Sequence, residues 1–407
     1  MAEQIAAVPR GATHTHQAGT EQPTHWSGVF AMSLCVFALI ASEFMPVSLL
    51  TPIAADLRIT EGMAGQGIAI SGAFAVLTSL SISWLAAGMN RKTLLLALTA
   101  LMAVSGAVVA LAPNFPVYMV GRALIGVVIG GFWSMAAATA MRLVPVDQVP
   151  RALAIFNGGN ALATVIAAPL GSYLGSIVGW RGAFFCLLPI AAIALIWQWS
   201  SLPTMRPTKR SSGSANVFKV LASRPVALGM AACGAFFMGQ FALFTYLRPF
   251  LETVTRVDVS TLSLTLLVIG VAGFIGTALI GAVLKRSLYG TLIVIPVFMA
   301  VIALTLIPSG TSVTAVVVLL GLWGLMATSA PVGWWSWIAE AMPHNAEAGG
   351  GLMVAVIQLA IALGSTVGGL LFDSMGYQST FMASAAVLLG AAALAFLTSR
   401  SQGRQTA

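Results

Sequence analysis

The chain has 407 residues, of which 58% are hydrophobic and only 7% are charged. In an ordinary soluble domain about a quarter of the residues are charged, and a soluble globule could not bury so much apolar surface. The composition therefore excludes an ordinary soluble protein and predicts a protein of the membrane.

Apolar runs long enough to cross about 30 Å of hydrocarbon as a helix occur throughout the chain. We count twelve of them, at residues 29–50, 64–86, 93–112, 117–138, 152–176, 183–199, 226–247, 262–284, 291–308, 313–338, 351–372 and 379–398. The sequence thus predicts an all-α membrane protein with twelve transmembrane helices.

The first 25 residues are polar and hold three of the four histidines. They contain no short apolar core before a small-residue cleavage site, so we expect a disordered tail and a first helix that stays attached. Cys35, Cys186 and Cys233 all fall within apolar runs, where cysteine acts as a small hydrophobe. We therefore expect no disulfide framework, no metal site and no cofactor.

The formal charge of +8 could suggest a nucleic-acid partner, but the positions of the basic residues indicate otherwise. If both termini are cytoplasmic, the outer loops hold only four basic residues and one lies within a helix, which leaves fourteen of the nineteen on the inside. The four outer residues and the one within a helix are Arg58, Arg181, Arg248, Arg256 and Arg122. By the positive-inside rule both termini are cytoplasmic, and the basic charge reports topology in the bilayer.

A long polar segment, residues 201–225, separates the first six helices from the last six. The fourth-helix sequence GFWSM at 131–135 recurs as GWWSW at 333–337 on the tenth helix, an offset of 202. Such internal repeats are typical of duplicated six-helix bundles. We therefore divide the chain into a cytoplasmic tail (1–25), an N-terminal bundle (26–200), a cytoplasmic linker (201–225), a C-terminal bundle (226–398) and a cytoplasmic tail (399–407).

Polar side chains are unevenly distributed among the predicted helices. The third, sixth, ninth and twelfth are almost purely aliphatic, whereas the first, fourth, fifth, seventh and eleventh carry Glu43, Arg122, Asn157, Asn160, Gln240 and Gln358. Polar groups within a bilayer turn towards protein or a water-filled cavity. We expect the polar helices to line a central cavity and every third helix to face lipid.

Two segments carry a family resemblance. YMVGRALIG (118–126) resembles the fourth-helix motif of the major facilitator superfamily, and ATVIAAPLGSYLG (163–175) resembles the fifth-helix antiporter motif of its twelve-helix drug and metabolite exporters. EFMPVSLLTP, GGFWSM, GWWSWI and VAVIQLA are similar to the branch that contains bacterial purine ribonucleoside efflux pumps. The resemblance implies two pseudo-symmetric halves that rock about a midplane site in the bacterial inner membrane. It implies export of small polar metabolites, purine ribonucleosides first, by proton antiport; export of arabinose-like sugars or drugs, or passive facilitation, are alternatives.

An acid within the first helix needs an explanation, because a carboxylate at membrane depth costs roughly 2.5 to 3.5 kcal/mol. Glu43 and Arg122 are expected about 12 Å and 9 Å from the outer helix ends, so they share one level. We expect them to communicate, directly or through water, and to alternate between paired and separated states as a proton-coupling device. The alternative is a static ion pair that fixes helix packing.

A nucleoside needs aromatic faces and hydrogen-bonding partners. Phe241, Phe244 and Tyr246 adjoin Gln240 on the seventh helix. The predicted substrate-binding residues are Trp133, Asn157, Asn160, Gln240, Phe244, Trp335 and Gln358. For the tryptophans an interfacial aromatic belt, which would also include Trp334 and Trp337, is the alternative.

The sequence contains no H-E-x-x-H, G-x-S-x-G or ATP-binding G-x-x-x-x-G-K-[ST] motif, so neither an enzyme nor an ATP-driven pump is expected. A scaffold or receptor would leave the polar helices unexplained. The expected partners are a nucleoside-like solute, protons and the lipid bilayer, and one chain is expected to function as a monomer.

Overall fold

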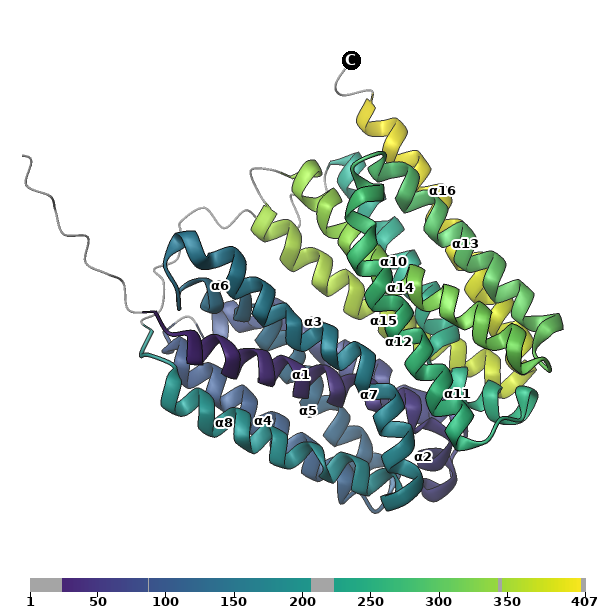
Figure 1. The fold of residues 1–407 in the computed structure, drawn as a ribbon, viewed down its shortest axis with the longest axis horizontal. Coiled ribbons are helices and arrows are strands. Elements are labelled where there is room, and N and C mark those ends of the chain that lie inside the picture. The colour runs from purple at the N-terminus through teal and green to yellow at the C-terminus, as the bar shows by residue number, and fades with distance from the viewer. Residues whose placement is uncertain (1–23, 87, 206–222, 343–345, 404–407) are drawn as a thin grey trace, which may run out of the picture.

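The computed structural model describes residues 24–86, 88–205, 223–342 and 346–403, and these residues form helices and short connections without a strand (Figure 1). The N-terminal half contains α1 (Trp26–Ser48), α2 (Leu50–Leu57), α3 (Glu61–Leu85), α4 (Arg91–Ala110), α5 (Phe115–Trp133), α6 (Ala136–Met141), η1 (Val146–Gln148), α7 (Val149–Phe185) and α8 (Leu187–Ser201). The C-terminal half contains α10 (Arg224–Phe244), α11 (Leu247–Phe250), η2 (Leu251–Thr255), α12 (Val259–Leu284), α13 (Leu288–Ser309), α14 (Val313–Ala341), α15 (Ala346–Met375) and α16 (Tyr377–Gly403).

Parts of the predicted tails and linker lie outside the described residues, namely 1–23, 206–222 and 404–407. Of the described parts of these segments, residues 24–25, 202–205 and 223 are not helical, and the rest are. Ser201 belongs to α8, Arg224 and Pro225 begin α10, and α16 continues to Gly403. Helices here extend past the apolar runs because polar residues beyond the hydrocarbon can still complete the helix.

Eleven helical stretches among the described residues are long and apolar enough to cross a membrane. One of them, Val146–Ser201, has 56 residues, which is far more than a bilayer requires. It is divided at Gly179, whose φ of 75° and ψ of 165° are not helical and suit glycine. This stretch therefore supplies two crossings, and the predicted twelve transmembrane helices are confirmed.

The backbone repeats its irregularities in the two halves. The non-glycine residues with positive φ are Arg58 (54°) and Arg256 (57°), which end α2 and η2, and the glycines are Gly179 (75°) and Gly376 (80°). The two members of each pair occupy equivalent places in the two halves. Arg58 and Arg256 follow the first and seventh crossings, and Gly179 and Gly376 follow the fifth and eleventh. The predicted pseudo-symmetry of two six-helix halves is therefore confirmed in the chain's local geometry.

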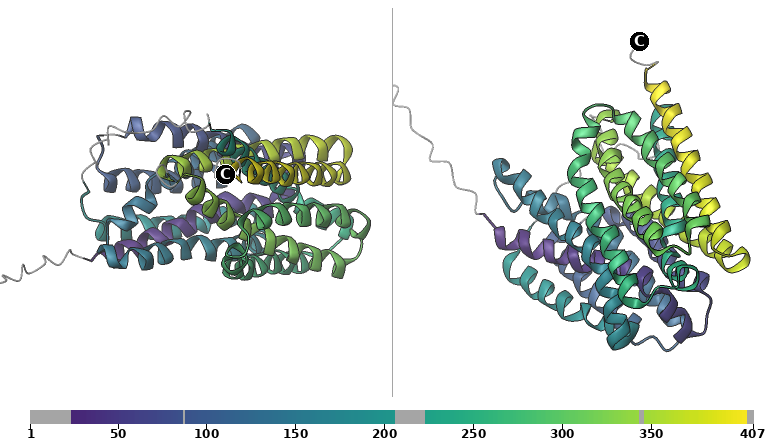
Figure 2. Two further views of the ribbon diagram at one scale, coloured as in Figure 1. Left: turned by 90° about the horizontal axis from the view of Figure 1, so that it is seen from above. Right: turned by 45° about the vertical axis from the view of Figure 1, so that its right-hand side comes forward.

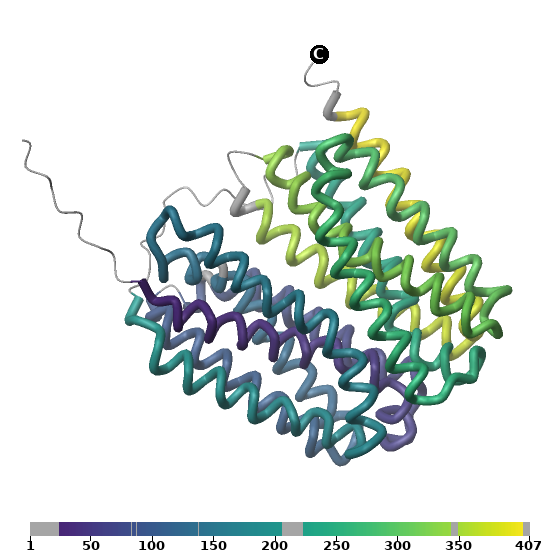
Figure 3. The backbone as a smooth tube through the Cα atoms, viewed as in Figure 1, coloured from purple at the N-terminus to yellow at the C-terminus, as the bar shows by residue number. Residues whose placement is uncertain are grey.

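The two halves lie side by side and meet mainly at one end (Figures 1 and 2). The main contacts between them join α1, α2, α3 and α7 to α11, α12 and α15, whereas α4, α8, α13 and α16 lie on the outside, as predicted for every third helix. We call the end with α2 and α11 the closed end. The end with the first and last described residues is the terminal end, and there the two bundles diverge, as the backbone trace in Figure 3 shows.

Candidate functional site

Arg122 on α5 is completely buried and joins three helices of the N-terminal half. Its Nη1 donates to the main-chain oxygen of Ser42 (2.8 Å), and Nη2 donates to the main-chain oxygen of Glu43 (3.1 Å) and to Ser71 Oγ (3.3 Å). Its Nε donates to the main-chain oxygen of Gly67 (3.0 Å). Each of the three guanidinium nitrogens thus donates to an oxygen of α1 or α3.

The sequence explains why α1 offers an acceptor at this point. Pro46 lies within α1, and proline has no N–H to donate to the carbonyl four residues earlier. That carbonyl belongs to Ser42, which accepts instead from Arg122. The proline and the arginine are therefore partners, and a buried main-chain oxygen that would otherwise lack a donor is satisfied.

The Glu43 carboxylate makes a different contact. It is 5% exposed, and its Oε1 accepts from Gln358 Nε2 of α15 at 3.3 Å, across the junction of the halves. Among the described residues, the ion pairs do not include Glu43. Glu43 and Arg122 thus lie at one level, and in this conformation Arg122 contacts the main chain of Glu43 while the carboxyl group contacts Gln358. The predicted alternation between paired and separated states stays a prediction.

Aromatic rings surround this contact. Phe44, next to Glu43, stacks on Phe241 of α10 with centroids 5.9 Å apart, and Phe241 meets Phe244 edge to face at 5.9 Å. The side-chain oxygens of Gln240 and Gln358 are buried and have no hydrogen-bond donor. Of the predicted substrate-binding residues, Gln358 therefore contacts Glu43, Phe244 belongs to the ring cluster that includes Phe44, and Gln240 precedes Phe241 on α10. Phe44 was missed, although its position beside the buried acid could have indicated it.

Asn157 and Asn160 on α7 lie nearer the terminal end. The bond from Ser33 Oγ to the main-chain oxygen of Ile155 (2.8 Å) aligns this part of α7 with α1 about ten residues from Glu43, or about 15 Å along the helix. Asn157 is exposed, and its side-chain amide donates to its own helix at Leu153 (2.9 Å). The two asparagines thus lie at a second level, separate from Glu43, and their role in binding stays a prediction.

Of the two matching tryptophans, Trp133 also lies at this level of α7. Trp133, at the end of α5, is half-buried and meets Phe156 edge to face at 6.2 Å. Trp335 on α14 is 47% exposed, whereas Trp334 and Trp337 are 2% and 0% exposed and pack edge to face. Trp334 and Trp337 are therefore core residues, so an interfacial belt does not account for them. Trp335 alone of the three faces outward from its half.

The closed end holds contacts that sequence reasoning missed. The carboxylate of Asp373 on α15 accepts from the Thr60 hydroxyl (2.5 Å) and from the main-chain N–H of Gly62 (2.9 Å) at the start of α3. Gln66 Oε1 accepts from the hydroxyl of Thr366 at 3.1 Å. An aspartate placed in this way caps a helix of the opposite half. No local motif indicates it, because its partner lies more than 300 positions away.

A basic side chain complements this cap. Arg248 on α11 donates to the main-chain oxygen of Ser48, where α1 ends, and its Nε donates to Glu252 at 2.7 Å. The C-terminal half thus contributes an anion at a helix start and a cation at a helix end, the signs that the helix dipole favours.

Repeated six-helix halves with polar contacts at their junction define a membrane transporter of the rocking two-bundle class. Residues 32–364 match the Major Facilitator Superfamily, and the chain belongs to that family. The predicted family resemblance is confirmed.

The relatives fall into two named groups. The chain is 67% identical over 394 residues, 96% of its length and 98% of the relative's, to the protein of Pseudomonas aeruginosa named transcription regulatory protein OpdE. It is 42% identical over 371 residues, 91% and 93% of the two chains, to the purine ribonucleoside efflux pump NepI of Salmonella paratyphi B. The predicted likeness to that kind of pump is confirmed.

Two solved structures share the fold at low identity. A bacterial homologue of the human lysosomal transporter Spinster, inward-facing and unoccupied, superposes with a TM-score of 0.74 at 16% identity, over 94% of this chain and 98% of that one. The nucleoside transporter NupG superposes with a TM-score of 0.73 at 12% identity, over 92% and 98%. These similarities establish the fold alone.

Proposed function

We propose that this transporter exports a small polar solute, a purine ribonucleoside in the first place, from the bacterial cytoplasm in exchange for protons. The observation that carries the proposal is the hydrogen bond between Glu43 and Gln358, a buried acid and a buried amide on opposite halves. Alternating access must break this bond when the halves rock, so the environment of the acid changes with conformation.

The orientation follows from charge. The predicted cytoplasmic loops carry most of the basic residues, so we place the terminal end in the cytoplasm. The halves meet at the closed end and diverge at the terminal end, which corresponds to a conformation open to the cytoplasm (Figure 1). We place the protein in the bacterial inner membrane with both termini inside.

In this conformation we propose that Glu43 carries a proton. A buried carboxylate without a cationic partner is strongly disfavoured in its charged form, and Arg122 is already occupied by main-chain oxygens. Solute that binds Gln358 from the cytoplasmic side removes the amide from Glu43 and admits water, so the proton leaves to the cytoplasm. Loaded with solute, the protein then opens outward, where Glu43 takes up the next proton.

The chemistry of the site suits a nucleoside. Phe44, Phe241 and Phe244 offer ring faces and edges for a base. The unpartnered oxygens of Gln240 and Gln358 can accept from ribose hydroxyls. Trp133, Asn157, Asn160 and Trp335 are proposed to contact the solute on its way in from the terminal end.

The names of the relatives support export, and one of them adds a question. The relative at 42% identity is named a purine ribonucleoside efflux pump, whereas the relative at 67% is named a transcription regulatory protein. In the parts of this chain that the structure describes, membrane helices and short connections leave little room for a DNA-binding module. We propose that any effect on transcription is exerted through the solute that the transporter removes.

The two halves of one chain supply all residues of the proposed site, so we propose that the monomer transports the solute. The test uses inverted membrane vesicles with an acidic interior and radiolabelled inosine. The parent protein should accumulate inosine against its gradient. Glu43→Gln should abolish accumulation but retain inosine counterflow, because the amide keeps the size of the site and loses the proton.

Glu340→Gln is the matched control, since Glu340 is exposed on α14 outside the site. It should accumulate inosine as the parent does. Accumulation by Glu43→Gln equal to that of the parent would refute the proton role. Competition separates the solutes: excess adenosine should block uptake, and a block by arabinose or by a cationic dye instead would assign a sugar or drug exporter.

A further inference from the structure

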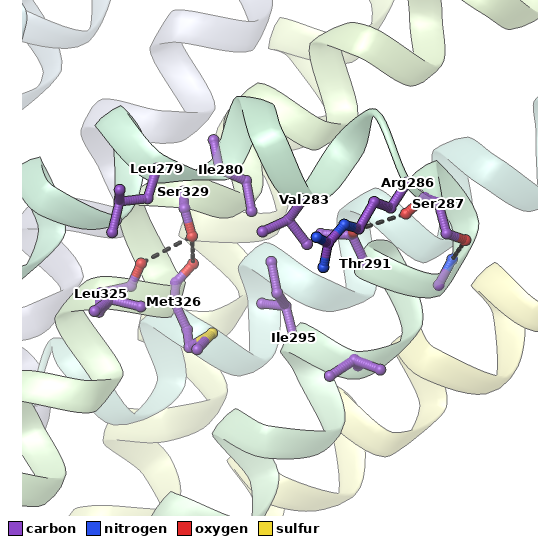
Figure 4. Close-up of a pocket in the computed structure, with 13 residues that line it drawn as sticks. Leu279, Ile280, Val283, Arg286, Ser287, Thr291, Ile295, Leu325, Met326 and Ser329 are labelled. Carbon is purple, nitrogen blue, oxygen red and sulfur yellow. Dashed lines mark hydrogen bonds between the residues drawn. The ribbon is translucent and has the colours of Figure 1, made fainter.

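An apolar groove runs along the outer face of the C-terminal half, away from the junction of the halves. It has a volume of about 410 Å³ and lies between α12, α13 and α14 (Figure 4). Leu279 and Val294, which line it, are 61% and 62% exposed. Since α13 is one of the outer helices, the groove opens towards the surrounding bilayer. None of its lining residues belongs to the transport site.

The length of the groove matches one leaflet. Its lining extends from Gly276 on α12 to Arg286 just beyond that helix, ten residues further along the chain, which is about 15 Å at the rise of an α-helix. This is half of the roughly 30 Å hydrocarbon core. The groove therefore reaches from the level of the lipid headgroups to about the middle of the bilayer, the depth that one acyl chain occupies.

One end of the groove carries a positive charge. Arg286 lies two residues beyond Leu284, the last residue of α12, and in Figure 4 its side chain lies at one end of the groove beside Thr291, with Leu325 and Met326 at the other end. Arg286 is exposed, and the ion pairs among the described residues do not include it. The start of α13, capped by Ser287, adds the positive end of a helix dipole beside it.

We propose that this groove binds one anionic phospholipid of the surrounding leaflet, with an acyl chain against the apolar lining and the phosphate against Arg286. The charge selects the occupant. A guanidinium without an acidic partner favours a lipid of net negative charge over a zwitterionic lipid, whose own ammonium group competes for the phosphate. A polar transport substrate does not fit, because leucine, isoleucine, valine and methionine supply seven of the thirteen lining residues.

The test measures lipid binding to the purified protein in neutral detergent by native mass spectrometry, with phosphatidylglycerol and phosphatidylethanolamine as probes. The parent should prefer phosphatidylglycerol by about tenfold, the order expected for one charge-assisted contact. Arg286→Gln should bring this preference close to parity. Lys285→Gln is the matched control, because it removes the same charge from a neighbouring residue that does not line the groove.

A second variant tests the acyl chain. Val294→Trp fills the groove and keeps Arg286, so it should weaken binding of both lipids. Inosine counterflow verifies that each variant is folded. Three results would overturn the proposal: an undiminished preference in Arg286→Gln, an equal loss in Lys285→Gln, which indicates general surface charge, or unchanged lipid binding in Val294→Trp.

Discussion

The closed end and the terminal end of the molecule differ in how the two halves meet. At the closed end, Asp373 and Arg248 of one half bind the ends of α3 and α1 in the other. At the terminal end, the helices of the two halves diverge (Figure 3). The halves are therefore joined by these polar contacts at the closed end and also by apolar packing, such as the stack of Phe44 on Phe241, while most of each half's apolar core lies within that half.

Polar caps suit a junction that must open. Water can replace them when the halves separate, whereas exposed apolar surface would carry a large free-energy penalty. Glycine brings the halves close without interlocking side chains: a Cβ on Gly72 would lie 2.7 Å from the main-chain oxygen of Gln358. Contacts within a half should thus govern stability, and contacts across the junction should govern conformation.

The largest effect is expected for Arg122→Gln, which breaks contacts within the N-terminal half. It leaves main-chain oxygens of α1 and α3 buried without their donor, so unfolding should become easier by roughly 2 to 4 kcal/mol. Thermal unfolding in detergent, followed by tryptophan fluorescence, measures this loss. Arg58→Gln, at an exposed arginine, should leave the midpoint unchanged. If Arg122→Gln shifted the conformation and left stability unchanged, the role of Arg122 in stabilising the N-terminal half would be contradicted.

Asp373→Ala should shift the conformation and leave stability almost unchanged. Loss of a charged cap is worth about 1 to 2 kcal/mol, so the population opened at the closed end should rise about five- to thirtyfold. Fluorophores on cysteines introduced at the exposed positions Pro113 and Thr311, with Cys186 replaced by serine, report the distance across the closed end.

Asp258→Ala is the control for this substitution. Asp258 also caps a helix, accepting from Thr261 N–H at 3.1 Å, but that helix belongs to its own half. Asp258→Ala should leave the distribution of the fluorophore distance the same as in the parent. Equal shifts in the two variants would show that capping as such, and not the link between the halves, changes the conformation.

Arg248→Gln should produce a smaller shift in the same direction, about threefold, because glutamine can still donate to the Ser48 carbonyl without the charge. The same fluorophore distance measures it. Arg181→Gln is matched, since Arg181 donates to the carbonyl of Ala112 within the N-terminal half. A larger effect from Arg181 than from Arg248 would refute the division between the two kinds of contact.

The sequence was sufficient for the fold, since apolar runs and charge bias report the bilayer directly. It was also sufficient to find Glu43 and Arg122 at one level. Their partners could not be predicted in the same way. Arg122 could donate to the Glu43 carboxylate or to a main-chain carbonyl. Which of the two accepts depends on the N–H that Pro46 lacks and on how α1 is rotated about its axis.

Contacts across the junction were the hardest to predict. Asp373 lies in a short polar stretch at the end of a long apolar run, as many solvated residues do. Its role depends on the position of one half relative to the other, which no local spacing encodes. Gln358, in contrast, was predicted as a substrate-binding residue, because an amide within an apolar run needs a partner, but its contact with Glu43 was not predicted.

The smallest effect is expected for the ion pair of Asp56 and Arg181, which lies at the closed end but joins residues of the same half. Acid should weaken its contribution to stability. The bond from Arg181 holds the pKa of the Asp56 carboxyl below its usual value, with a further bond from Trp180. A lowered pKa adds stability above the unfolded value, near about 3.9, and this stability is lost as the pH falls through the folded value. Both side chains are more than a third exposed, so the contribution of this ion pair to stability is below about 1 kcal/mol.

The difference in unfolding midpoint between the parent and Asp56→Asn should therefore be constant from pH 7 to 5 and shrink below about pH 4. The same substitution should leave the fluorophore distance between the halves unchanged. If that distance changed with Asp56→Asn, contacts within a half would also set the conformation, and the contrast between the two kinds of contact would not hold.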